Sequence, residues 1–162
     1  MLPPLDSPEA LSRRRQILPR IPPTTLDALG IGFDVPVRDA LRDARHLGKS
    51  TWLATCAGEF GGGLLELTKG KLKVRHRGCF LALRQVGEEI WAFEGSQHLE
   101  EGYGRIWRID RRYLGSLAPV ADLPGEPQAV RVASSEALVA TNRGDVAVGP
   151  DGSLSPLDCE PL

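Results

Sequence analysis

The sequence lacks the features that mark enzymes, membrane proteins and nucleic-acid-binding proteins. It has no apolar run of membrane-spanning length, and its N-terminus lacks the basic start and apolar stretch of a secretory signal. Its net charge of -1 provides no general attraction for nucleic acid or for an anionic membrane. Motifs of serine hydrolases, zinc proteases, phosphate-binding loops and dinucleotide-binding folds do not occur. We therefore expect no catalytic activity, no cofactor, no membrane association and no nucleic-acid partner.

Cysteine and histidine are scarce as well. The three cysteines, Cys56, Cys79 and Cys159, are an odd number without CxxC spacing, and they do not indicate a disulfide framework. A reducing cytoplasm is therefore the simplest location, with Cys79 as a small buried side chain. The three histidines are far apart in the sequence, and no pair has the spacing of a recurrent zinc site. We expect no metal site.

What the sequence does contain indicates one all-β domain. The chain has 162 residues, of which 41% are hydrophobic, enough to form a core of its own. Glycine (18 residues) and proline (13 residues) exceed the average, whereas strong helical stretches are few. This balance favours many short strands joined by turns.

A short phrase occurs three times, at a period of roughly 40–50 residues, which is typical of stacked supersecondary units. The phrase reads Trp52-Leu53-Ala54-Thr55, Ile90-Trp91-Ala92-Phe93 and Leu138-Val139-Ala140-Thr141. Each copy precedes a loop with glycine and two further β-like runs. Strands are expected before the second and third copies, and hairpin turns are expected at Lys69-Gly70, 86–89 and Asp151-Gly152. Each unit therefore predicts four antiparallel strands.

Residues 36–162 form this β domain, and residues 1–35 form a proline-rich, partly helical arm. Ser7 as N-cap and Pro8 at the first helical position predict a helix that ends before Pro19. A second short turn is expected at 25–29, with Gly30 as its C-cap. Both are too short to be stable alone, so the arm must dock on another surface or stay mobile.

Residues 36–48 allow two interpretations. Apolar residues recur there at helical spacing, with Asp34 as a helix N-cap and Gly48 as a stop. The same segment lies where the other two units carry their first strand. We favour a strand from Val37 to Arg42, which makes the three units alike.

These units resemble the blades of bacterial β-propellers, and the two-component-regulator propeller repeats are the closest likeness. The phrases at 138–152 and at 52–55 followed by 61–64 carry the resemblance, which extends over 37–157. It implies a partial β-propeller of about three four-stranded antiparallel blades, although propellers typically close with about four to eight. Three alternatives for closing the fold remain: a homodimer that completes six blades, an arm that covers the open edges, or a different small barrel or sandwich.

Two groups of side chains are candidate contact surfaces. In the strand expected at 71–77, basic and apolar residues alternate, so the basic ones should share one face and His76 the other. This basic stripe consists of Lys71, Lys73, Arg75 and Arg77. A stripe of this kind can contact phosphates or an acidic partner, but it is also typical of an outermost strand kept soluble by charge, which we favour.

The second surface lies around the loop expected at 94–104, on the same rim as the loop at 56–63. Loops on a rigid sheet often carry binding residues, and Arg105 beside Trp107 predicts a cation–π contact. The candidate binding residues are Glu59, His98, Glu100, Tyr103, Arg105 and Trp107. The alternative is that the loops only connect strands and that Trp107 packs between blades.

The resemblance and the missing catalytic set together favour a non-enzymatic protein-binding module, and a toxin-neutralising immunity protein is one specific form of this hypothesis. A second hypothesis is a small-ligand binder or enzyme that uses the rim loops around Cys56 and His98. Nothing in the sequence marks the orienting acid or the oxyanion hole that such a dyad needs. A third is a structural subunit that assembles through open blade edges.

Overall fold

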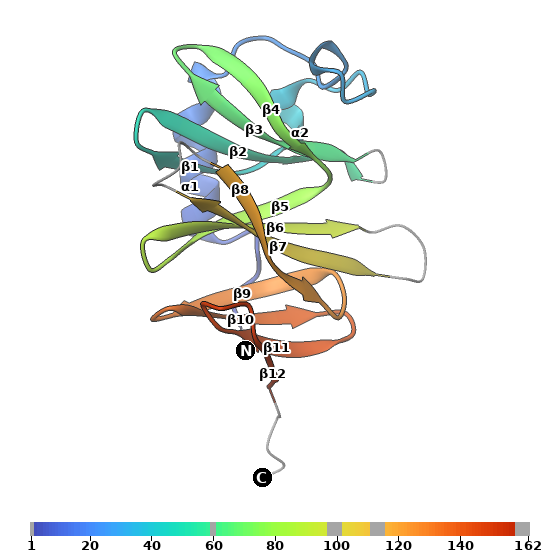
Figure 1. The fold of residues 1–162 in the computed structure, drawn as a ribbon. Helices are drawn as coiled ribbons and strands as arrows, with labels where there is room; N and C mark the ends of the chain where they lie inside the picture. The colour runs from blue at the N-terminus through green and yellow to red at the C-terminus, as the bar shows by residue number, and fades with distance from the viewer. Residues whose placement is uncertain (1, 59–60, 97–101, 111–115, 158–162) are drawn as a thin grey trace.

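The computed structural model describes residues 2–58, 61–96, 102–110 and 116–157 of the chain. These residues form three four-stranded antiparallel sheets and a short N-terminal helix (Figure 1). The all-β class and the partial, propeller-like arrangement of about three blades are thereby confirmed. We call the three sheets blade 1, blade 2 and blade 3.

In each blade the strands pair in sequence order. Blade 1 contains β1 (Leu41–Leu47), β2 (Ser50–Cys56), β3 (Gly62–Thr68) and β4 (Lys71–Arg77). Blade 2 contains β5 (Phe80–Val86), β6 (Glu89–Ser96), β7 (Tyr103–Asp110) and β8 (Ser116–Leu123). Blade 3 contains β9 (Pro127–Ala133), β10 (Glu136–Thr141), β11 (Gly144–Val148) and β12 (Leu154–Pro156). All three predicted hairpin turns join neighbouring strands. Lys69 and Gly70 between β3 and β4 have φ of 52° and 75°, as a two-residue hairpin turn requires.

The first strand begins later than predicted. Residues Val37–Ala40 form a single helical turn, α2, and the strand β1 follows it at Leu41. The proposed strand from Val37 to Arg42 is therefore wrong over most of its length. The turn forms because Val37 and Ala40, three positions apart, both bury their side chains against the arm and β1.

The pairing of the first two strands skips one residue in every blade, at Arg42, Leu81 and Gln128. Thr55, Glu94 and Thr141 are paired just before this irregularity and hold the same position in the three blades. In the sequence analysis, the second copy of the repeated phrase was therefore placed one residue too early relative to the other two copies. The segment in register with Trp52–Thr55 and 138–141 is 91–94, not 90–93.

The hydrophobic core lies between the blades. Blades 1 and 2 bury Trp52, Leu64, Phe80, Leu83 and Ile90 between them, whereas blades 2 and 3 bury Trp91, Phe93, Ile106, Val130 and Val139. The strands that face a neighbour on both sides are consequently apolar on both faces, and six of the seven residues of β2 are buried. This explains why the repeated phrase is a continuous apolar run rather than an alternating one.

The N-terminal arm is docked on the blades. It contains α1 (Pro8–Ile17) and the 3₁₀ turns η1 (Leu18–Arg20) and η2 (Asp27–Leu29). As predicted, the Ser7 hydroxyl caps α1 by accepting from the Ala10 amide at 3.2 Å, and Gly30 ends η2 with a φ of 80°. Ile17, Ile21 and Leu26 are almost fully buried against the outer face of blade 1.

The start of the arm reaches the opposite end of the molecule. The Val130 amide of β9 donates to the Pro3 carbonyl at 3.0 Å, so the chain before α1 pairs with the first strand of blade 3. From there the arm passes behind blade 2 to α1, which lies along β1 (Figure 1). The arm therefore runs past the first strands of all three blades. No helix in the described part of the chain is long and apolar enough to span a membrane.

Cys56 and Cys79 form a disulfide bond, with their Cα atoms 4.6 Å apart. The expectation that the cysteines stay unpaired, with Cys79 as a simple buried thiol, is wrong for these two. The sequence spacing of 23 residues gave no signal, because the pair meets only when β2 ends beside the connection from blade 1 to blade 2.

Candidate functional site

The ends of β2 and β6 lie at one rim of the molecule. Cys56 closes β2, and its disulfide partner Cys79 accepts a hydrogen bond from the Gly95 amide of β6 at 2.9 Å. This rim carries the two loops that the sequence analysis selected. Glu59, His98 and Glu100 of those loops lie outside the described residues, so the structure does not place them.

Tyr103, Arg105 and Trp107 lie on the face of β7 that is turned toward blade 1, because alternate residues of a strand share a face. The Arg105 guanidinium carbon is 5.5 Å from the centre of the Trp107 ring and 5.8 Å from that of Tyr103. The expected cation–π contact with Trp107 is therefore present, and Tyr103 makes a second one. We call these three residues the rim patch.

Asp122 of β8 fixes the position of Arg105. Its Oδ1 atom accepts from the Arg105 Nε at 2.6 Å, and this hydrogen bond raises the pKa of the guanidinium above its ordinary value. Within the described residues, Nε is the Arg105 atom that donates a hydrogen bond. The side chain is 34% exposed.

A buried carboxylate lies beneath the rim patch. Glu94 of β6 is 8% exposed and accepts from the Trp107 indole N–H at 2.8 Å and from the Tyr103 hydroxyl at 3.4 Å. Partial burial raises the pKa of Tyr103, and the negative charge of Glu94 raises it further. Tyr103 is thereby kept as a neutral donor, and both aromatic side chains donate to one acceptor, which fixes their orientation.

Sequence reasoning missed Glu94 because it assigned this residue to a loop. In blades 1 and 3 a threonine holds the same position, and its hydroxyl donates to a glycine carbonyl of the next strand at 2.7 Å (Thr55) and 2.6 Å (Thr141). Blade 2 therefore departs from the other two at the place where the rim patch lies. A charged residue aligned with two threonines was the signal, but the one-residue alignment error concealed it.

The other wall of the site comes from β4 of blade 1. The ring of His76 lies 4.4 Å from that of Trp107 and 5.9 Å from that of Phe80. The prediction that His76 shares a face with the apolar residues Leu72 and Val74 is wrong, because those two pack on the side of the arm. His76 faces blade 2 because the pairing of β3 with β4 skips Arg75, and a bulge exchanges the two faces of a strand beyond it.

The same bulge divides the basic stripe. Lys71 and Lys73 lie on the face toward blade 2, where Arg75 also contacts Trp52 and Glu66. Arg77 pairs with Gly63 on the opposite face, which packs against Ile31 of the arm. The prediction that the four basic residues share one face is therefore wrong. β4 is an outermost strand of its blade, as the favoured interpretation expected.

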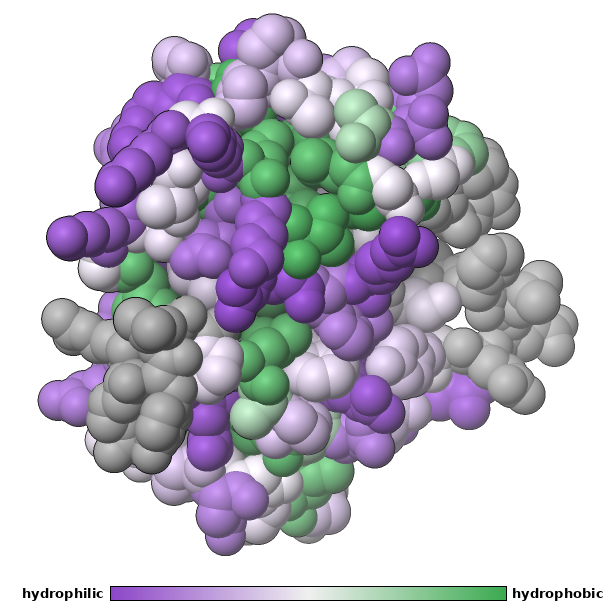
Figure 2. Space-filling view, turned by 45° about the horizontal axis from the view of Figure 1, so that its top comes forward, coloured by the Kyte–Doolittle hydropathy of each residue, from purple (hydrophilic) through white to green (hydrophobic). Residues whose placement is uncertain are grey.

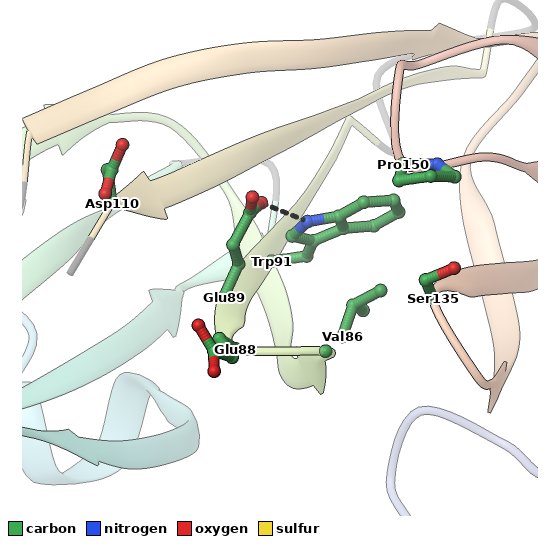
Figure 3. Close-up of a pocket in the computed structure, with 8 residues that line it drawn as sticks. Val86, Glu88, Glu89, Trp91, Asp110, Ser135 and Pro150 are labelled. Atoms are coloured by element: carbon green, nitrogen blue, oxygen red, sulfur yellow. Dashed lines mark hydrogen bonds between the residues drawn. The ribbon is translucent and has the colours of Figure 1, made fainter. Parts of the chain in front are cut away.

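A cavity of about 320 Å³ opens between blades 2 and 3 at the opposite rim (Figure 3). Glu89 there accepts from the Trp91 indole N–H at 3.1 Å and lies 2.6 Å from the Arg108 Nε. Arg108 also donates to the Pro150 carbonyl at 2.8 Å. Glu89 and Arg108 form an ion pair, and through Arg108 this pair connects blade 2 to the loop before β12.

The described part of the rim site contains a disulfide, two aromatic rings and an arginine. Cys56 cannot act as a thiolate nucleophile while its sulfur is in the disulfide. Among the described residues no group of three histidine, cysteine or acidic side chains is placed to hold a metal ion. What the site offers is an oriented cation between two aromatic rings. Comparison of the chain with protein-family models, with curated proteins and with solved structures gives no significant match.

Proposed function

We propose that this protein is a non-enzymatic, protein-binding module and that the rim patch is its contact surface. The observation that carries the proposal is the placement of Arg105 between Tyr103 and Trp107, with Asp122 holding its Nε. Tryptophan, tyrosine and arginine are the residues most often found to dominate the binding energy of protein interfaces.

The rigidity of the rim patch supports this proposal. Glu94 binds both aromatic donors from below, so little side-chain freedom remains to be lost on binding. Tyr103 is also 38% exposed. Within the described residues, Leu154 is the only other large hydrophobic side chain that is exposed to this degree. On the face shown in Figure 2, hydrophobic surface is enclosed by hydrophilic side chains. Tyr103 is thus one of two such exposed side chains in the described part of the chain, and it lies beside a fixed arginine.

We further propose that the three blades are propeller-type repeats and that the partner is a toxin that this protein neutralises. The charged Arg105 favours an acidic surface on that partner, since electrostatic complementarity suppresses wrong partners. A gene for a secreted toxin beside the gene for this protein would support the specific form. The general binding role does not depend on it.

The test is affinity capture with three forms of the chain. Wild type and an Arg20→Ala control, which removes an exposed arginine of the arm, should retain the same specific partner. Arg105→Ala should weaken this complex by about tenfold or more, the cost of about 1.4 kcal/mol at an interface anchor. Equal retention by all three forms would contradict the assignment of the rim patch.

The cytoplasmic location is also a proposal, and the disulfide bears on it. Disulfides persist mainly in oxidising compartments, whereas cytoplasmic thiols are kept reduced. Thiol titration of the denatured protein, taken from its native host without reductant, distinguishes the two. Three reactive thiols per chain would support the cytoplasm, and one would support an oxidising compartment.

A further inference from the structure

A second, independent site lies where the first strands of the blades meet the arm. A cavity of about 450 Å³ is lined there by β1, β5, β9 and the beginning of the arm. Four arginines line it, one from each of these elements: Arg13 from α1, Arg45 from β1, Arg84 from β5 and Arg131 from β9. Glu9 is the only acidic residue in the described lining.

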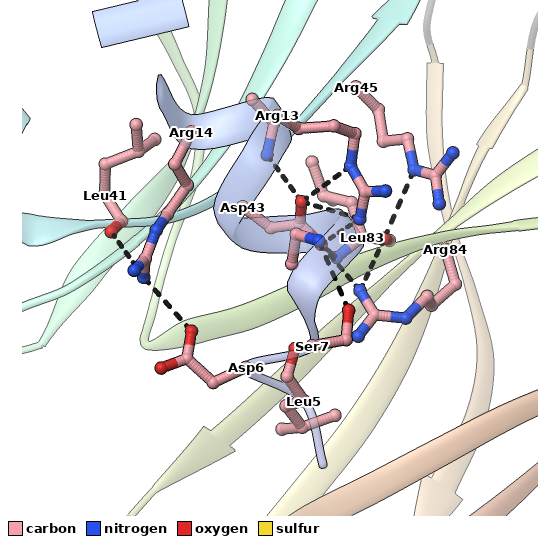
Figure 4. Close-up of polar contacts among 12 residues, drawn as sticks. Leu5, Asp6, Ser7, Arg13, Arg14, Leu41, Asp43, Arg45, Leu83 and Arg84 are labelled. Atoms are coloured by element: carbon pink, nitrogen blue, oxygen red, sulfur yellow. Dashed lines mark hydrogen bonds and ion pairs between the residues drawn. The ribbon is translucent and has the colours of Figure 1, made fainter. Parts of the chain in front are cut away.

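One buried acid, Asp43, lies behind the wall of this cavity, and both of its carboxylate oxygens already accept hydrogen bonds. Its two carboxylate oxygens accept from Arg13 at 3.0 and 3.1 Å and from Arg84 at 2.7 Å. The amides of Leu83 and Ala44 also donate to it, at 2.9 and 2.8 Å. Figure 4 shows these arginines gathered around Asp43, with Arg45 at the side.

Arg45 is left without an acidic partner among the described residues. Its only described hydrogen bond is a long one, from Nε to the Leu83 carbonyl at 3.5 Å. The Arg131 side chain lies on the face of β9 opposite to Val130 and Val132 and is exposed, so it is left out of the charge count. Counting Glu9 and Asp43 against Arg13, Arg45 and Arg84 leaves an excess of one positive charge at the cavity. Two like-charged guanidinium groups, those of Arg13 and Arg84, lie close enough to repel Arg45.

The pKa shifts of two of these arginines agree with this excess of positive charge. Burial lowers the pKa of Arg45 below its ordinary value, and the charges of Arg13 and Arg84 lower it further, against the opposing effect of Asp43. Burial likewise lowers the pKa of Arg84, in spite of its contact with Asp43. Ser7, the N-cap of α1, also lines the cavity, so the positive end of the helix dipole adds to the field.

We propose that this cavity binds a small oxyanion, carried by a phosphate-bearing or dicarboxylate solute. Arginine suits this role because its planar fork of N–H groups matches phosphate and carboxylate oxygens. The cavity falls within the usual range for small-molecule sites, about 300–1,000 Å³.

The test is isothermal titration calorimetry with inorganic phosphate and with succinate, against sodium chloride of the same ionic strength. Wild type should bind at least one of the two dianions saturably and in preference to chloride. A response confined to phosphate assigns a phosphate-bearing solute, and one confined to succinate assigns a dicarboxylate; either supports the site. The absence of binding beyond that of chloride would overturn the proposal.

Two variants make the test specific to the cavity. Arg45→Gln should fold normally, because it loses one long hydrogen bond and relieves repulsion, and it should weaken binding by about tenfold, as expected for a lost charge-assisted hydrogen bond. Arg20→Gln makes the same change of charge on the exposed arm and should leave affinity unchanged. Equal affinity of Arg45→Gln and wild type would also overturn the proposal.

Discussion

Asp43 connects the arm to blades 1 and 2. It is fully buried, and it joins α1, β1 and β5 through Arg13 and Arg84. Replacing it by alanine leaves two arginines without their acid in a largely buried setting. We expect Asp43→Ala to lower the free energy of unfolding by about 3–5 kcal/mol, measured by urea denaturation.

Asp122→Ala is the matched control for this prediction. The Asp122–Arg105 pair has a shorter N–O distance, 2.6 Å, but the Asp122 side chain is 72% exposed. An exposed ion pair contributes about 0–1 kcal/mol, because water screens it. If both substitutions cost the same, burial is not what gives Asp43 its importance.

Glu94 allows a second prediction, about Tyr103. Because the folded pKa of Tyr103 lies above its unfolded value of about 10, the native protein holds this proton more tightly than the unfolded chain. Its stabilising contribution is present below about pH 10 and is lost as the pH rises through the folded pKa. Glu94→Gln removes a negative charge and should move the tyrosinate transition to lower pH.

The measurement is a near-ultraviolet absorbance titration in a Tyr113→Phe background, since the chain has only two tyrosines. Glu136→Gln, at the start of β10, serves as the control and should leave the transition where it is. An unchanged transition in Glu94→Gln would show that Glu94 does not act on Tyr103.

Residue-level prediction from the sequence succeeded where strand alternation held. The Arg105–Trp107 contact followed from a period of two along β7, which has no irregularity between these residues on its β6 side. Glu94 could not be found in the same way. Its significance depends on its position opposite Phe80 and Arg105, and that register is visible only once the strands are paired.

Among the elements, the link between blades 1 and 2 is covalent. The Cys56–Cys79 disulfide closes a loop that includes all of β3 and β4. Cross-linking a loop of this length stabilises a fold by about 3 kcal/mol, mainly by restricting the unfolded chain. Reduction with dithiothreitol should therefore lower the urea midpoint by an amount that corresponds to this free energy. The strand signal in circular dichroism should remain. No change on reduction would contradict this role.

The arm gives a further prediction at the element scale. Leu26 is fully buried between the arm and blade 1, so Leu26→Ala should cost about 2–5 kcal/mol in the free energy of unfolding. Leu154→Ala, at a position that is 44% exposed, should cost far less. The readout is again urea denaturation. Similar costs would mean that the arm is not part of the folded body in solution.

Helices and turns were predicted well where their caps and turn residues are close in the sequence. They were predicted poorly where packing against distant segments determines the structure. Ser7, Pro8 and Gly30 fix the bounds of their helices through their own backbone preferences. The helical turn at α2 and the bulge at Arg75 arise from contacts with distant segments. A single sequence without those contacts cannot show them.

At the scale of the whole molecule, the open side of blade 1 is already occupied. In a ring shared by two chains, the outer face of blade 1 would have to receive blade 3 of the second chain. The arm covers that face with the side chains of Ile17, Ile21 and Leu26. The outer face of blade 3 carries short or charged side chains, such as Ala140, Arg131 and Asp145. We therefore expect the three blades and the arm to form a complete body within one chain.

The most direct test is the absolute mass in solution, measured by light scattering across a dilution series. The account predicts the mass of one chain at every concentration, because the arm closes the fold and leaves the rim patch to a different protein. A mass of two chains that persists on dilution would contradict it. That result would mean that a second copy displaces the arm and that the blades complete a ring between chains.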